Sequence, residues 1–116
     1  MTIRRLPQWM PMTGITLFGS IWVKRLNDRM TIAHEEAHAR QQREHPIWFW
    51  VSYCLLLPLG PNRWRREWEA EAYGTVEARW GVPVESLART LSGPLYGWCC
   101  TERQAREAIE RWRDAK

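Results

Sequence analysis

His34 and His38 are two of the three histidines in this chain, and they lie four residues apart with Glu35 between them. On an α-helix, side chains at this spacing project from the same face, so both imidazoles can direct a ring nitrogen at one point. Such a pair is suited to hold a metal ion, and Glu35 lies off their axis but near enough to accept a proton from a metal-held water. The spacing indicates a hydrolytic zinc site, with a chance occurrence in a polar helix as the competing interpretation.

A catalytic zinc ion needs a third protein ligand besides the two histidines, together with one open position. Because no histidine lies outside residues 34–45, we expect a carboxylate, and the segment "REWEAEAYG" offers Glu67, Glu69 and Glu71. At about 100° per residue, the apolar side chains around this segment gather on one helix face that contains Glu69, whereas Glu67 lies outside it and Glu71 at its margin. A charged carboxylate on an apolar face is costly unless it is paired or binds a metal. The pattern favours Glu69 as the third ligand, with an ion pair to Arg65 as the alternative.

Helical signals place both parts of this site on helices. Thr31 is a candidate N-cap for a helix that ends near His45, because the proline that follows disfavours helical geometry there. Asn62 is suited to cap a second polar helix over residues 63–80, which Gly81 and Pro83 end. A short helix over residues 84–91 and a last helix capped by Thr101 complete the prediction.

Two further segments surround the helix that carries the histidines. Residues 14–25, "GITLFGSIWVKR", are rich in β-branched and aromatic residues and predict two short strands or one bent strand. The apolar run from Ile47 to Leu57 predicts a buried helix, because it is shorter than the about 20 residues that cross a bilayer. We therefore expect one domain over residues 1–116, with an α+β fold that is mostly helical and has a short N-terminal β element.

Around these residues the chain resembles the gluzincin metallopeptidases, in particular their small bacterial and phage-type members. The likeness is carried by His34-Glu35-x-x-His38-x-x-Gln41, by the apolar stretch that ends in "LLLP", and by Glu69-x-Glu71-Ala72-Tyr73. It implies a minimal zincin-like fold in which His34, His38 and Glu69 bind Zn²⁺ and Glu35 is the general base. A second register, Glu67-x-Glu69-Ala70-Glu71, fits the same pattern, so the family match alone does not choose between Glu67 and Glu69.

The resemblance also implies hydrolysis of a peptide bond in a peptide or protein substrate. It suggests that the strand signal, in particular "SIWVKR", forms a sheet edge along which an extended peptide lies. Gln41 is a candidate for a hydrogen bond around the metal ligands, or it faces water. Candidates for stabilising the reaction's oxyanion are Tyr53, Tyr73, Tyr96 and His45, each equally suited to a structural role.

Composition limits the partners and the compartment. The net charge of +4 comes from a small excess of basic residues that we expect to be dispersed, which disfavours nucleic-acid binding. The three cysteines are odd in number and suggest no disulfide framework, and the N-terminus has no clear cleavage site, so we expect a cytoplasmic protein. A peripheral membrane contact through the apolar run remains the minority interpretation.

A non-catalytic module is the alternative function. In it, zinc only stabilises the packing of helices, and the surface contacts a protein, a nucleic acid or a membrane. A closed fourth ligand, such as Cys99, Cys100 or a second glutamate, would favour this alternative, because it removes the open position that catalysis requires.

Overall fold

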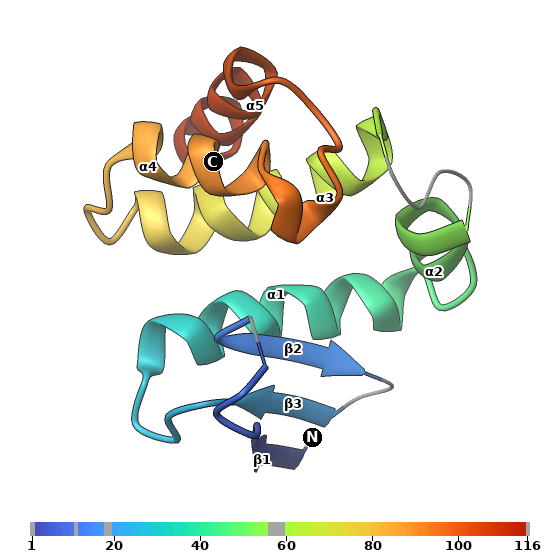
Figure 1. Ribbon diagram of the computed structural model, residues 1–116, viewed down its shortest axis with the longest axis vertical. Coiled ribbons are helices and arrows are strands. Elements are labelled where there is room, and N and C mark those ends of the chain that lie inside the picture. Colours follow the sequence, from blue (N-terminus) through green and yellow to red (C-terminus); the bar gives the residue numbers. More distant parts are fainter. Residues whose placement is uncertain (1, 11, 18–19, 56–59, 116) are drawn as a thin grey trace.

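The computed structural model describes residues 2–10, 12–17, 20–55 and 60–115. The helix α1 (Arg29–Glu44) runs through the middle of the molecule, with a small sheet on one side and a layer of helices on the other (Figure 1). The protein therefore has an α+β fold that is mostly helical with a short N-terminal β element, as expected. None of the helices among the described residues combines the length and the apolar character that a membrane span requires.

The sheet consists of β1 (Thr2–Arg5), β2 (Gly14–Leu17) and β3 (Ser20–Val23), in the order β1-β3-β2. β3 pairs in parallel with β1 and antiparallel with β2. Two short strands within residues 14–25 are confirmed, whereas β1 was not predicted because four residues with two arginines carry little strand signal. The expectation that "SIWVKR" forms the sheet edge is wrong, because its strand β3 lies between β1 and β2. β1 and β2 are the edge strands, and β2 is the one beside the candidate site described below.

Side chains on the inner face of the sheet fix it against α1. Ile21 and Val23 are fully buried, and Thr16 of β2 is 4% exposed. The N-cap of α1 is Asp28, whose Oδ1 accepts a hydrogen bond from the Thr31 amide at 3.1 Å, so the prediction of Thr31 as the cap is wrong. A carboxylate at this position satisfies the first amides and faces the positive end of the helix dipole.

After α1, the apolar run forms α2 (Trp48–Trp50) and a π-helix, η1 (Val51–Leu55). Phe49 is buried, but Ile47 is 77% exposed and Trp48 is 43% exposed. The prediction of a buried helix is therefore right for one face only. Residues 56–57 at the end of the run lie outside the described residues.

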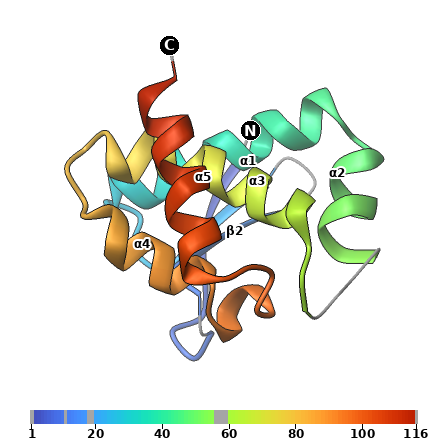
Figure 2. The same ribbon diagram turned by 90° about the horizontal axis from the view of Figure 1, so that it is seen from above.

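The helical layer begins with α3 (Arg63–Ala72), whose first turn is capped by Asn62 as predicted, and it continues without a break into a π-helix, η2 (Tyr73–Ala78). It is completed by α4 (Val84–Leu91), the 3-10 turn η3 (Pro94–Tyr96) and α5 (Glu102–Asp114). Seen from above, α5 lies across α3 with α4 beside it, and α2 lies at the opposite end (Figure 2). The predicted cap of the last helix is confirmed, because Thr101 and Gln104 form a capping box.

Close packing joins η2 to α5. A Cβ atom on Gly74 would lie 2.6 Å from the Trp112 Cβ and 2.7 Å from the Ile109 main-chain oxygen, so only glycine permits this approach. Ala105 and Ala108 present small side chains from α5 and are fully buried. The helix that carries the glutamates is thereby fixed from behind, on the side away from α1.

Candidate metal centre

Three predicted ligands meet where α1 faces α3. Glu69 Oε1 lies 3.2 Å from His34 Nε2 and 3.0 Å from His38 Nε2. The three residues are between 2% and 6% exposed. Ligand atoms at the zinc bond lengths of about 2.0–2.1 Å in a tetrahedral site lie roughly 3.3 Å apart, so these separations, which are also hydrogen-bond distances, are compatible with one shared ion.

The outer nitrogen of each imidazole has its own acceptor. His34 Nδ1 lies 2.9 Å from Glu77 Oε2, and His38 Nδ1 lies 2.8 Å from Gln41 Oε1. The Gln41 amide nitrogen donates to the Trp68 main-chain oxygen and to Glu71 Oε1, so its Oε1 can only accept. Both histidines therefore carry a proton on Nδ1 and direct Nε2 inward, as metal-ligating histidines do.

This proton placement has a consequence for the inner face of the cluster. With Nδ1 protonated, a neutral imidazole presents a lone pair at Nε2, and both lone pairs face the same carboxylate oxygen of Glu69. Three buried lone pairs that converge repel one another unless a proton or a cation lies among them. Without a metal ion, His34 carries such a proton, because its pKa is raised to about 10. The donor set therefore fits a divalent ion bound through two imidazoles and one carboxylate, which is a zinc ligand set.

The charges of the site also shift the pKa values of His34, His38 and Glu69. Burial lowers the pKa of His34, but hydrogen bonds to Glu69 and Glu77 outweigh this effect and raise it to about 10. For His38, the charge and hydrogen bond of Glu69 outweigh burial, and its pKa is also raised. Burial raises the pKa of Glu69, but the two histidines outweigh it and hold that pKa far below its usual value. The directions of these shifts show that the histidines and the ionised Glu69 stabilise one another's charge.

Glu35 lies beside the ligands and faces β2. It is 6% exposed, and its Oε1 accepts a hydrogen bond from Thr16 Oγ1 at 2.9 Å. Burial raises the pKa of Glu35, and the nearby His38 and His34 oppose this increase. Ligand atoms of Glu35, His34 and His38 lie within 4.8 Å of one another. The carboxylate thus stands close enough to the ligand set to exchange a proton with a group held there.

β2 can approach Glu35 because position 14 is glycine. A Cβ atom there would lie 2.7 Å from Thr31 Cγ2 and 3.1 Å from Glu35 Cγ. Such contacts would displace either the strand or the carboxylate. Gly14 therefore sets the distance between the sheet and the site.

A cavity of about 320 Å³ opens over this group between β2, η1 and η3. Glu35, His38 and Glu69 form the polar part of its wall. The remaining lining residues are mostly apolar or aromatic and are Met12, Gly14, Ile15, Thr16, Leu17, Phe49, Trp50, Tyr53, Leu95 and Tyr96. Its size and composition are typical of a site that admits an apolar side chain.

Two of the four predicted oxyanion candidates line this cavity. Tyr53 donates its hydroxyl hydrogen bond to Glu69 Oε2, and the Tyr96 hydroxyl lies 2.7 Å from that of Tyr73. Tyr73 packs edge-on against His34, with ring centroids 4.5 Å apart. His45 is exposed and packs on Trp68 at 5.5 Å, away from the cavity wall.

The structure distinguishes between the carboxylates of α3. Glu67 pairs with Arg111 on the surface at 3.1 Å, and Glu71 pairs with Arg40 at 2.8 Å. Only Glu69 of these three reaches the histidines, as the apolar-face argument predicted. Arg65 donates to the main-chain oxygens of Tyr53 and Tyr96. Cys99 and Cys100 lie in the core cluster with α4 and α5, with their sulfurs 3.8 Å apart.

Two residues of the site were missed from the sequence, Thr16 and Glu77. On a regular α-helix the residue seven places after Glu69 shares its face, which is Val76. The π-helix η2 takes in one more residue per turn, and Glu77 occupies that position instead. Thr16 had no local signal, because its role depends on how β2 packs on α1.

No family model, no curated protein and no solved structure matches this chain.

Proposed function

We propose that the protein is a zinc-dependent peptidase, with His34, His38 and Glu69 as the metal ligands and Glu35 as the general base. One observation carries the proposal: two inward imidazole nitrogens with fixed tautomers converge on one buried carboxylate oxygen. A structural ion pair with Glu69 would need only one histidine, whereas here two converge on the same oxygen.

When bound, zinc would polarise the scissile carbonyl and make a water more acidic. Glu35 then accepts the proton of the attacking water and passes it to the leaving amine. The raised pKa of Glu35 suits this proton exchange, because it makes the carboxylate a stronger base. It also helps Glu35 to keep the proton until it is passed to the leaving amine. The hydroxyl of Thr16 orients the carboxylate.

The substrate is a peptide in an extended conformation. β2 forms the edge of the sheet beside the cavity, and the main-chain groups of an edge strand can pair with an added strand. The apolar lining of the cavity accepts a large apolar side chain next to the bond that is cleaved. Tyr53 and Tyr96 stand in the cavity wall, where a phenol can donate to a developing oxyanion.

The test combines metal analysis with hydrolysis. Protein purified without chelator or added metal is analysed for zinc and assayed on a set of quenched fluorescent peptides with large apolar residues. We expect one zinc per chain, lost in Glu69→Gln and retained in Glu35→Gln, which loses hydrolysis by at least about a hundredfold. Zinc-free wild type, or unchanged hydrolysis in Glu35→Gln, would refute the proposal. Glu67→Gln serves as the matched control and should keep both properties.

One observation favours the second candidate, a non-catalytic zinc-stabilised module. Glu35 lies close enough to His34 and His38 to be a fourth ligand, which would close the site. X-ray absorption of the zinc-loaded protein distinguishes the two functions. A hydroxamate binds zinc only where a coordination position is open. Zinc with four protein ligands and a spectrum that the hydroxamate leaves unchanged would support the non-catalytic module, whereas a changed spectrum supports an open position.

A further inference from the structure

The net charge of the chain is confined to its N-terminal part. Residues 1–33 hold five of the seventeen basic residues and one of the thirteen acidic residues, so the remaining twelve of each sign cancel. The expectation that the basic excess is dispersed is therefore wrong. The five cations are Arg4, Arg5, Lys24, Arg25 and Arg29, and we call them the basic cluster.

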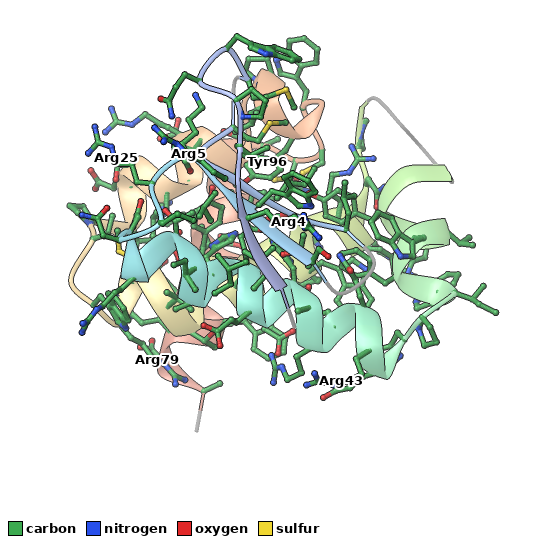
Figure 3. All side chains as sticks on the ribbon, turned by 90° about the horizontal axis from the view of Figure 1, so that it is seen from below. Arg4, Arg5, Arg25, Arg43, Arg79 and Tyr96 are labelled. Atoms are coloured by element: carbon green, nitrogen blue, oxygen red, sulfur yellow. The ribbon has the colours of Figure 1, made fainter. Side chains whose placement is uncertain are left out.

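The basic cluster is carried by β1, by the segment that leads from β3 to α1, and by the first residue of α1. Figure 3, viewed from the side of the sheet, shows Arg4, Arg5 and Arg25 on this side of the molecule. Arg4 stacks over Trp22 at 5.6 Å. Asp28, the one acidic residue within residues 1–33, accepts hydrogen bonds from Thr31 at the start of α1. Among the residues that the structure describes, no ion pair includes a member of the basic cluster.

The strand register connects the cluster to the cavity. Ile15 lines the cavity and lies opposite Trp22, and Trp22 lies opposite Arg4 on the next strand. These three side chains form one row across the outer face of the sheet. Neighbouring strands lie about 4.8 Å apart, so a chain added to β2 lies roughly 15 Å from the Arg4 backbone. The long arginine and lysine side chains shorten this separation to the range over which charges act at physiological salt, about 8 Å.

We infer that the preferred substrate is an acidic polypeptide, with aspartate or glutamate residues flanking the apolar residue that enters the cavity. This inference rests on the proposed function. A peptide is favoured over a nucleic acid because Arg4 and Arg5 belong to the same sheet as the edge strand β2, whose main-chain groups can pair with another polypeptide backbone. The basic cluster attracts the acidic residues of the substrate, while the edge strand and the cavity fix the position of its backbone. The charges then act mainly by raising the rate of association.

Binding is tested separately from hydrolysis. The Glu35→Gln variant is titrated against three labelled peptides that share one apolar centre and are flanked by Glu, Ser or Lys, with fluorescence anisotropy as the readout. We expect the Glu-flanked peptide to bind roughly tenfold more tightly than the Ser-flanked one at low salt. The difference should vanish near 0.5 M salt, where screening shortens the range of these charges.

Reversing the charge of residues in the basic cluster tests whether the cluster causes the preference for the Glu-flanked peptide. The triple variant R4E/R5E/R25E, in the Glu35→Gln background, should lose the preference for the Glu-flanked peptide. The matched control R89E/R106E reverses two exposed cations on α4 and α5, in the layer that does not contain the sheet, and should keep it. If the triple variant fails to fold by circular dichroism, the salt dependence of the Glu35→Gln protein decides, because a preference independent of salt would overturn the inference.

The outcomes separate the two proposals. Equal binding and equal hydrolysis of the Glu-flanked and Ser-flanked peptides would overturn the acidic substrate while leaving the peptidase intact. A salt-sensitive preference without hydrolysis of any peptide by the wild type supports the basic cluster as a binding surface and counts against the peptidase. A single-stranded oligonucleotide that displaces the Glu-flanked peptide at lower concentration than unlabelled peptide would overturn the assignment in favour of a nucleic acid.

Discussion

Glu77 offers the sharpest test of the proposed metal centre, because it lies outside the proposed ligand set and contacts one of its histidines. Its two carboxylate oxygens lie 3.0 and 2.9 Å from His34 Nδ1, and its side chain is only 12% exposed. Glu77→Gln keeps the shape and one acceptor but removes the negative charge, and Glu77→Ala removes the acceptor as well. Loss of such a partner costs about 10-fold to 100-fold in metal affinity, which corresponds to about 1.4–2.7 kcal/mol.

We expect Glu77→Gln at the lower end of this range and Glu77→Ala at the upper end. The measurement is competition for zinc against a chromophoric chelator, performed on folded protein verified by circular dichroism. Glu67→Gln is the matched control, since Glu67 pairs with Arg111 on the surface and should leave zinc affinity unchanged. Wild-type affinity in both Glu77 variants, together with a large loss in Glu69→Gln, would refute the view that Glu77 fixes the orientation of His34.

Three further outcomes are expected. Gly14→Ala should lower the free energy of unfolding by about 1–3 kcal/mol, because its Cβ would lie 2.7 Å from Thr31 Cγ2, and urea titration measures this change. Thr16→Val removes a hydrogen bond that lowers the pKa of Glu35, so the acidic limb of the hydrolysis pH profile should shift to higher pH; an unmoved limb would contradict this role. In chelator-treated protein, the fold raises the pKa of His34 from its ordinary value of 6.5, which applies to the unfolded chain, to about 10. Its stabilising contribution is therefore complete below pH about 6.5 and lost as the pH rises towards 10. The melting temperature of chelator-treated wild type should fall over this interval by more than that of His34→Gln, and an equal fall in both would argue against the pairing with Glu69 and Glu77.

Local patterns predicted the parts of the site that depend on one element. The spacing of His34 and His38 on α1 and the position of Glu69 on the apolar face of α3 are helical periodicities, which a sequence displays directly. The caps Asn62 and Thr101 are equally local, because a cap bonds within its own first turn. For these features the sequence and the structure agree.

The features that the sequence did not predict depend on packing between elements or on irregular backbone. The predicted helix runs to residue 80, but η2 ends at Ala78 and Trp80 is 56% exposed. Thr16 meets Glu35 only because β2 lies on α1. The strand β1 owes its place to a parallel partner, β3, that is distant in sequence.

The π-helix η2 has a mechanical consequence for the site. Glu69 and Glu77 belong to one continuous helical rod, and they contact opposite nitrogens of the same imidazole ring. If this rod slides or rocks against α1, both carboxylates move together, so the ring of His34 tends to follow them rather than turn between them. The one extra residue in η2 thus couples the orientation of a ligand to the position of a whole helix. Deleting a single residue between Tyr73 and Glu77 would uncouple the two while leaving every residue of the site in the chain.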